Sequence, residues 1–267
     1  MAAAMTAHDI FRLDGRVVFL SGAAGHLGRE MALALGHAGA TLILNGRNPA
    51  RLEAFAAELK RVGIASECAG FDMMDFDSVR RFFGARPRLD ILINNAVTMT
   101  PGSFAEASPA DFDSAYRSTV TASFEAVRAA RSALARAADK WGDASVINVT
   151  TMYASVSPDP KLYSVPGQMS PPHYGAAKAG LVQLTRHLAA ELGPEGVRVN
   201  ALSPGPFPTD EIASRDPAFA GRLAARTMLG RTGRAAEIGG PVLFLASRAS
   251  SFVTGAVLTA DGGWTAW

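Results

Sequence analysis

The sequence is poor in cysteine, in clustered charge and in long apolar runs, and each shortage excludes a class of protein. Cys68 is the one cysteine among 267 residues, so no internal disulfide can form and a reducing, cytoplasmic location is expected. The formal net charge is +2 without a long basic run, which argues against nucleic-acid and membrane-surface partners. No apolar stretch is long enough to cross a bilayer, and the first residues lack the basic start of a signal peptide. We therefore expect a soluble globular protein.

Apolar material, by contrast, is plentiful: 48% of the residues are hydrophobic and 19% are charged, which is enough for a large core. Short β-branched runs alternate with stretches of helical period. Strands are expected at Arg16–Leu20, Thr41–Asn45, Ala65–Gly70, Ile91–Asn94, Ser145–Val149, Val197–Leu202 and Ala256–Thr259. Helices are expected near 27–38, 49–62, 75–83, 109–138, 174–192 and 235–247.

This alternation predicts the fold class. Strands that read as continuous apolar runs, such as Val17–Leu20, suit a parallel sheet covered on both faces. Regular β–α alternation indicates a doubly wound sheet. Because no composition shift marks a linker, we predict one α/β domain over residues 1–267. It would be a Rossmann-like fold with a mostly parallel, seven-stranded sheet and helices on both faces.

Three segments are expected to lack regular structure. Residues 1–12 are interpreted as a flexible N-terminus, and residues 152–172 and 204–228 as loops at the active site. The segment 152–172 carries five prolines and no sustained period. A loop of this length inside a compact domain is often functional. A tolerated surface insertion is the alternative, and the sequence leaves both open.

A glycine-rich turn follows the first expected strand and precedes an apolar helix. Its glycines are Gly22, Gly25 and Gly28, and His26 and Leu27 lie between the last two. Glycines at such a turn let the backbone approach a pyrophosphate at the helix N-terminus. The spacing differs from the G-x-G-x-x-G fingerprint, so a purely structural strand–helix turn is the alternative.

The end of the second expected strand discriminates between the two nicotinamide dinucleotides. NAD-binding folds usually carry an acid there, about 20 residues beyond the glycines, to bind the ribose hydroxyls. Here the run is Asn45-Gly46-Arg47, without an acid. Arginine forms charge-assisted hydrogen bonds to a 2′-phosphate that an acid would repel. We predict NADP(H) rather than NAD(H), although NAD(H) stays possible if Arg47 is only a solvated surface charge.

Tyr174 and Lys178 are the candidate catalytic pair. They lie four residues apart at the start of an apolar helical stretch, so they share one face of the helix. A phenol titrates near pKa ~10, and a nearby cation favours the phenolate. Carbonyl reduction or alcohol oxidation requires such a general acid–base. The same spacing is common in helices without any catalytic role, so the pair alone does not show that these residues are catalytic.

Together these features resemble the short-chain dehydrogenase/reductase family over nearly the whole chain. The motifs that carry the resemblance are Ser21–Gly28, Asn94–Ala96, Tyr174–Lys178, Arg198–Gly205 and Asp261–Trp264, in the family's order. Within the family, the ending Asp261–Trp267 and the run Asn45–Arg47 look most like the gluconate 5-dehydrogenase group. The resemblance implies a homotetramer, or a homodimer, that packs through the helices near 109–138 and 174–192. No metal site is expected.

The resemblance also implies roles for individual residues. Tyr174 would be the acid–base, and Lys178 would bind the nicotinamide ribose and lower the pKa of Tyr174. The remaining implied cofactor contacts are Asp72 at the adenine, Asn94 and Ala96 beside the adenosine, and Pro204 and Gly205 facing the nicotinamide. For Asp72, an N-cap of the following helix is the alternative, with Asp75 competing for that position.

The chain departs from the family pattern at four positions. His26 replaces a glycine of the turn and would crowd the pyrophosphate unless Gly25 absorbs the strain. Val97 replaces the glycine that follows Asn94–Ala96. Thr151 stands at the position of the substrate-orienting serine and keeps its hydroxyl. Thr119 aligns with the proton-relay asparagine and lacks the amide, which puts that relay in question.

These residues lead to three hypotheses for the function. The first is an NADP(H)-dependent oxidoreductase acting on a polar carbonyl or secondary alcohol, with a sugar acid such as gluconate or 5-ketogluconate as the expected substrate. The second is a 3-oxoacyl thioester reductase, and the third a non-catalytic, dinucleotide-binding regulatory protein. Five arginines could meet a substrate carboxylate, or form a solvated helix face; they are Arg215, Arg222, Arg226, Arg231 and Arg234.

Overall fold

The computed structural model describes residues 6, 8–164 and 169–267. Seven parallel strands form one sheet in the order β3-β2-β1-β4-β5-β6-β7. The strands are β1 Val17–Ser21, β2 Thr41–Gly46, β3 Ser66–Gly70, β4 Ile91–Asn94, β5 Ala144–Val149, β6 Val197–Pro204 and β7 Val257–Ala260. The predicted doubly wound α/β fold is confirmed. The strand order reverses between β1 and β4, and a crevice at the carboxyl ends of the strands is expected at that point.

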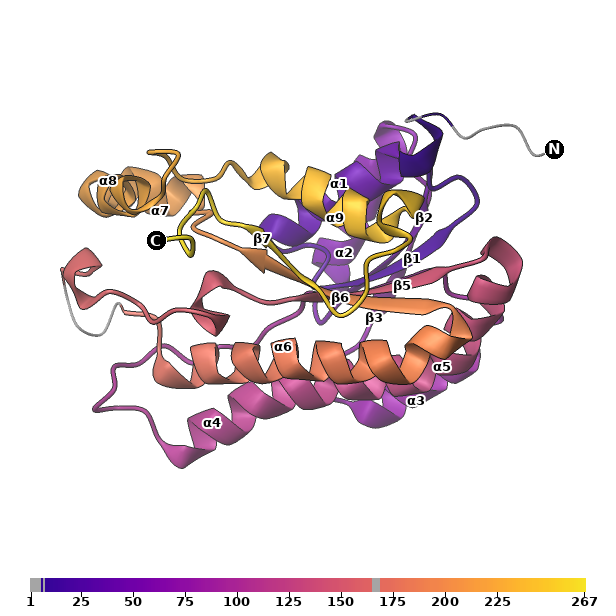
Figure 1. Cartoon of the computed structure of the whole chain (residues 1–267), viewed down its shortest axis with the longest axis horizontal. Coiled ribbons are helices and arrows are strands. Elements are labelled where there is room, and N and C mark those ends of the chain that lie inside the picture. Colours follow the sequence, from indigo (N-terminus) through magenta and orange to yellow (C-terminus); the bar gives the residue numbers. More distant parts are fainter. Residues whose placement is uncertain (1–5, 7, 165–168) are drawn as a thin grey trace.

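Helices cover both faces of the sheet (Figure 1). They are α1 His26–His37, α2 Pro49–Arg61, α3 Phe76–Gly84, α4 Pro109–Tyr116, α5 Ala122–Trp141, α6 Pro172–Leu192, α7 Asp210–Arg215, α8 Pro217–Arg226 and α9 Gly239–Ala246. A π-helix over Arg117–Thr121 joins α4 to α5. Short 3-10 helices lie at Asp9–Phe11, Met152–Ala154, Pro160–Leu162, Gly193–Glu195, Ala235–Ile238 and Arg248–Ser250.

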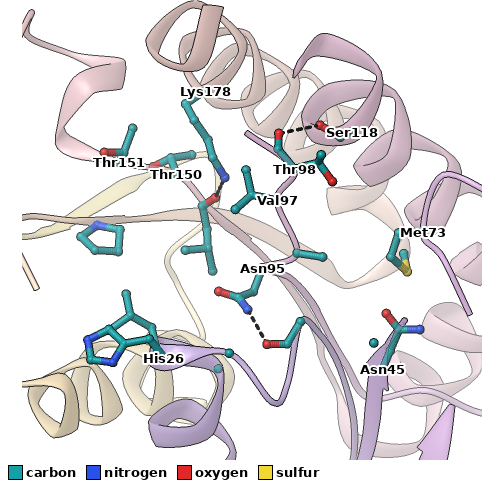
Figure 2. Close-up of a pocket in the computed structure, with 18 of the residues that line it drawn as sticks. His26, Asn45, Met73, Asn95, Val97, Thr98, Ser118, Thr150, Thr151 and Lys178 are labelled. Carbon is teal, nitrogen blue, oxygen red and sulfur yellow. Dashed lines mark hydrogen bonds between the residues drawn. The ribbon is translucent and has the colours of Figure 1, made fainter. Parts of the chain in front are cut away.

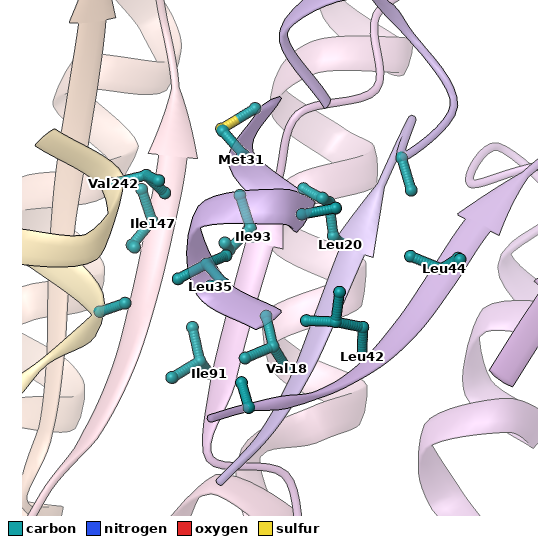
Figure 3. Close-up of a cluster of buried hydrophobic side chains, with 14 of the residues drawn as sticks. Val18, Leu20, Met31, Leu35, Leu42, Leu44, Ile91, Ile93, Ile147 and Val242 are labelled. Carbon is teal, nitrogen blue, oxygen red and sulfur yellow. The ribbon is translucent and has the colours of Figure 1, made fainter. Parts of the chain in front are cut away.

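Alternating side chains of the strands build two cores. Val18 and Leu20 of β1 point to the face covered by α1 and α9, whereas Phe19 points to the face covered by α3 and α5. Figure 3 shows the first core, where Met31 and Leu35 of α1 lie over the strands. Burial of both sheet faces explains why the strands read as unbroken apolar runs.

Two of the three segments expected to be irregular are partly regular. In 204–228, β6 extends to Pro204 and two helices follow; the side chains of Thr209 and Asp216 cap them by accepting hydrogen bonds from the backbone N–H groups of Ile212 and Phe219. These caps outweigh the proline content on which the loop prediction relied. In 152–172 the two 3-10 helices replace a continuous loop, and residues 165–168 lie outside the described residues.

The flexibility expected of residues 1–12 stays a prediction. Residues 1–5 and 7 lie outside the described residues, and Asp9–Phe11 forms a 3-10 turn. The long helix predicted at 109–138 is also interrupted, because the π-helix separates α4 from α5. Within the described part of the chain, no helix combines the length and apolar character needed to span a bilayer.

The amino ends of the strands carry a buried ionic network. Asp143, just before β5, accepts from Arg16 at 2.7 Å and from Arg198 at 3.1 Å. Asp90, just before β4, accepts from the backbone N–H of Val17 at 2.7 Å and from Arg88 at 3.1 Å. Buried charges are tolerated when paired and hydrogen-bonded in this way. The charged residues at this edge of the sheet are therefore bonded to one another and to the backbone.

Candidate active site

A pocket of about 430 Å³ opens at the carboxyl edge of the sheet, across the point where the strand order reverses. It runs from the ends of β2 and β3, past the glycine-rich turn, to the start of α6. Figure 2 shows Asn45 and Met73 at one end and Thr150, Thr151 and Lys178 at the other. The pocket therefore brings together motifs that are far apart in the sequence.

The glycine-rich turn forms the floor of the pocket. Gly22 has φ +64°, a left-handed conformation that favours glycine. A Cβ on Gly28 would lie 2.2 Å from the Gly22 carbonyl oxygen, so only glycine fits there. Helix α1 begins directly after Gly25, and its first N–H groups have no partner within the helix. This bare backbone and the positive helix end fit a dinucleotide diphosphate.

The backbone before His26 is unstrained, because Gly25 has φ −80°, a conformation open to any residue. Crowding of a pyrophosphate by His26 stays a prediction. The His26 Nε2 atom lies 3.2 Å from the carbonyl oxygen of Phe207, in the segment after β6. The imidazole is thus turned towards the wall of the pocket, and Leu27 and Gly28 complete the lining of the turn.

The far end of the pocket carries the residues that were predicted to bind the adenosine. Arg47 lines it with 63% of its side chain exposed, and its guanidinium is 4.0 Å from the Asp72 carboxylate. That carboxylate also accepts from the Met74 N–H at 2.9 Å. Asp75, rather than Asp72, caps α3 by accepting from Ser78. Asp72 therefore does not cap the helix and lines the pocket; its contact with the adenine stays a prediction.

Asn95 and Ala96 line the pocket, and Asn94 does not. The Asn94 side chain is buried and donates to Asn148 at 2.9 Å, which in turn donates to Thr185 at 2.9 Å. Asn95 donates instead to the Ser21 carbonyl oxygen at 2.9 Å. Of the two asparagines, the structure thus brings the second to the pocket, because successive side chains along a strand point to opposite sides.

Tyr174 and Lys178 lie in the first turns of α6 and both line the pocket, as does Thr151 at the end of β5. Lys178 is 3% exposed, and its Nζ donates to the Val149 carbonyl oxygen at 2.6 Å. Burial without a counter-charge lowers the pKa of Lys178 from 10.5 to about 8. Pro204 and Gly205, at the end of β6, face the same end of the pocket.

The pKa of Tyr174 differs from the sequence-based expectation. Burial raises the pKa of the Tyr174 phenol, and a hydrogen bond with the Thr151 side chain opposes this. No lowering by Lys178 is found, and the lysine ammonium donates to the Val149 carbonyl oxygen. The neutral phenol therefore holds its proton, which suits a group that donates a proton to a developing alkoxide.

The π-helix decides which residue of 117–121 reaches the pocket. Ser118 lines it, and its hydroxyl lies 3.4 Å from the Thr98 carbonyl oxygen (Figure 2). Thr119, the predicted relay position, is buried, and its carbonyl oxygen accepts from the Ser123 hydroxyl at 2.7 Å. The structure does not bring Thr119 to the pocket. One extra residue in the turn rotates the following side chains, and helical periodicity in the sequence does not reveal this.

Sequence reasoning missed several other lining residues, among them Phe71, Met73, Thr98, Ser118 and Phe207. A parallel sheet presents every strand end at one edge, so the residues just beyond β3, β4 and β6 could have been found by position alone. None of the five candidate arginines lines this pocket. Arg231 and Arg234 pair with Glu237, and Arg222 donates to the Leu162 carbonyl oxygen at 2.7 Å.

Comparison with known proteins supports this geometry. A family profile described as enoyl-(acyl carrier protein) reductase matches residues 22–265. Gluconate 5-dehydrogenase of Gluconobacter oxydans is 34% identical, over 98% of this chain and 99% of its own. Galactitol 2-dehydrogenase of Cereibacter sphaeroides is also 34% identical, over 98% and 100%. A solved gluconate 5-dehydrogenase from Burkholderia cenocepacia, in complex with NADP and tartrate, has a TM-score of 0.85 at 30% identity, over 98% and 100%. The chain belongs to the short-chain dehydrogenase/reductase family of NAD(P)-dependent oxidoreductases.

Proposed function

We propose that this protein transfers a hydride between NADP(H) and a polar carbonyl or secondary alcohol, and that its substrate is a sugar acid of the gluconate and 5-ketogluconate type. The observation that carries the proposal is a single pocket with a glycine cradle at one end and Thr151, Tyr174 and Lys178 at the other. A protein that only bound the dinucleotide would have no need of the buried tyrosine–lysine pair.

Three residues of this chain have separate roles in the reaction. When bound, the nicotinamide supplies or accepts the hydride at the substrate carbon. The Thr151 hydroxyl holds the substrate oxygen, and the neutral Tyr174 phenol donates its proton to that oxygen as the alkoxide forms. Lys178, held at the same end of the pocket, would bind the nicotinamide ribose. In the direction of alcohol oxidation each of these transfers runs in reverse.

Two observations support NADP(H) as the cofactor. Arg47 is exposed at the far end of the pocket, and its nearest acid, Asp72, is at the limit of ion pairing at 4.0 Å. A guanidinium in this situation can take a phosphate as a stronger partner. The solved Burkholderia gluconate 5-dehydrogenase contains NADP, which supports the same choice for this relative.

The substrate class rests on the relatives and on the charge around the site. The two curated relatives reported above act, by name, on gluconate and galactitol, both polyhydroxylated. The 3-oxoacyl-[acyl-carrier-protein] reductase of Aquifex aeolicus, which is 28% identical over 94% of this chain, supports a 3-oxoacyl thioester reductase as a second candidate. An acidic carrier protein would call for a free basic surface, whereas Arg231 and Arg234 are paired with Glu237. We therefore favour the sugar acid.

We also propose a homotetramer or homodimer. Apolar side chains stay exposed on the outer side of α4 and α5, with Phe112 43%, Tyr116 54% and Phe124 38% accessible. Exposed apolar side chains that lie close together often mark an interaction surface. Association through these helices would bury them.

The decisive experiment measures NADPH consumption with 5-ketogluconate for the wild type and for Tyr174→Phe. Loss of the phenolic proton is expected to lower kcat by about 10²–10⁴-fold without weakening NADPH binding. Tyr116→Phe, which removes a hydroxyl from an exposed tyrosine, is the matched control and should keep full activity. Full activity of Tyr174→Phe would refute the mechanism, and NADPH binding without turnover of any carbonyl would favour a regulatory role.

A further inference from the structure

Two tyrosines outside the catalytic pair share a hydrogen bond beside the reaction centre. The hydroxyls of Tyr153 and Tyr163 are 2.8 Å apart. Tyr153 lies in the 3-10 turn directly after Thr151, and its backbone N–H donates to the Thr151 hydroxyl at 3.4 Å. Neither phenol is needed for the chemistry described above.

The start of α6 holds Tyr153 against the catalytic tyrosine. A Cβ on Gly175, the neighbour of Tyr174, would lie 2.9 Å from the Tyr153 carbonyl oxygen. This close approach of backbones fixes the turn beside Tyr174. The Tyr153 ring also packs edge-on against Trp264 at 6.4 Å. Tyr153 is thus positioned by packing and not by its hydroxyl.

Only one of the two phenolic hydrogens takes part in the hydrogen bond between Tyr153 and Tyr163. Two phenols carry two hydrogens, and their mutual bond uses one of them. Within residues 6, 8–164 and 169–267, neither phenol oxygen has another hydrogen-bond partner. The second hydrogen therefore meets no acceptor in this part of the chain and is available to an oxygen of a bound ligand.

The residues around the two phenols indicate which kind of ligand oxygen can bind to them. Tyr163 lines a second pocket of about 490 Å³ together with Phe104 and Pro160, and no charged side chain is among its described lining residues. A carboxylate bound there would lose water without gaining a counter-charge, which is unfavourable. A neutral hydroxyl, which can both donate and accept, suits the paired phenols.

We infer that the Tyr153–Tyr163 pair binds a hydroxyl group of the substrate at a carbon other than the reacting one. The inference rests on the proposed function, because it takes the carbonyl to react at Tyr174. It assigns the two tyrosines to specificity. They select polyhydroxylated substrates over simple ketones and over acyl chains that lack hydroxyls.

The test compares two ketones of equal length. 5-Ketogluconate and 5-oxohexanoate share six carbons, a C5 carbonyl and a C1 carboxylate, and only the first carries hydroxyls. With NADPH, the variant Tyr153→Phe/Tyr163→Phe is expected to lose about tenfold in kcat/KM for 5-ketogluconate, mainly through KM, because one hydrogen bond is removed. Its kcat/KM for 5-oxohexanoate should not change, which also shows that the variant is folded.

Other outcomes separate this inference from the proposed function. Equal losses for both ketones, or no loss for either, would overturn the inference. If the wild type reduces neither ketone, the proposed function fails, and the tyrosine pair is then judged by binding. Calorimetric titration of the NADP⁺ complex with 5-ketogluconate should show about tenfold weaker binding to the double variant. Equal affinities would overturn the inference, and Tyr116→Phe is the control in both assays.

Discussion

The cations at the two edges of the sheet differ in whether they are paired with a carboxylate. At the amino edge, Arg16 and Arg198 are buried and share the carboxylate of Asp143 at 2.7 and 3.1 Å. At the carboxyl edge, Lys178 is buried but bonds only to a neutral carbonyl oxygen, and Arg47 is exposed with its carboxylate partner 4.0 Å away. The same seven strands thus carry buried cations paired with a carboxylate at one end, and at the other a buried cation bonded to a neutral oxygen and an exposed one that is loosely paired.

This difference separates stability from function. A paired buried charge contributes to the fold only while its partner is present, and removing one partner leaves the other unpaired. An unpaired cation, by contrast, destabilises the fold but is available to a ligand. Substitutions at the amino edge should therefore change the free energy of unfolding and spare catalysis. Those at the carboxyl edge should impair catalysis or cofactor binding, and removal of the buried cation there should not destabilise the fold at neutral pH.

The largest effect is expected at Asp143. Asp143→Ala would leave the guanidinium groups of Arg16 and Arg198 buried without a counter-charge, which should lower the free energy of unfolding by about 3–5 kcal/mol. Urea denaturation measures this change. Asp77→Ala, which breaks an exposed ion pair with Arg80, is the control and should lower it by less than about 1 kcal/mol. Similar losses in the two variants would contradict the contrast between the edges.

A second prediction concerns pH and Lys178. Its pKa is about 8 in the folded protein against an ordinary value of 10.5, so the unfolded chain binds more protons between these values. The wild type should therefore gain stability relative to Lys178→Met as pH rises from 8 to 10.5, by on the order of 3 kcal/mol. At pH 7 the inactive methionine variant should be the more stable protein.

Urea denaturation of both proteins at pH 7 and pH 10 measures this difference, in which all other titrations cancel. Lys60→Met, in the exposed last turn of α2, is the matched control and should show no such pH dependence. A stability difference between wild type and Lys178→Met that does not change with pH would show that the ammonium is already balanced by a charge.

The sequence predicts the sheet better than it predicts the pocket. All seven strands were placed within two residues at their starts and ends, because continuous apolar runs such as Val17–Leu20 arise only where both faces are covered. Tyr174, Lys178 and the glycine turn were also found from their spacing, and Thr151 from the family resemblance; the pocket brings them together.

The misplaced residues share a physical cause. Asn94 and Asn95 are chemically identical, and only the direction of the strand end decides that the second reaches the pocket. Ser118 replaces Thr119 because of one extra residue in a π-turn. The pKa of Tyr174 is raised by burial in the folded protein, which a spacing of four residues does not reveal. Side-chain direction, rather than the position of secondary structure, is what the sequence leaves open.

The smallest effect is expected at Arg47, where the open edge meets solvent. Arg47→Ser should raise KM for NADPH about tenfold, because a charge-assisted hydrogen bond to the 2′-phosphate is lost, and should leave KM for NADH unchanged. The free energy of unfolding should not change, since the side chain is 63% exposed and paired only at 4.0 Å. Arg61→Ser, which removes the same charge from the exposed end of α2, controls for net charge. An equal rise of KM for both cofactors would mean that Arg47 holds a part common to them. Arg47 would then contribute to the binding of both NADPH and NADH without discriminating between them.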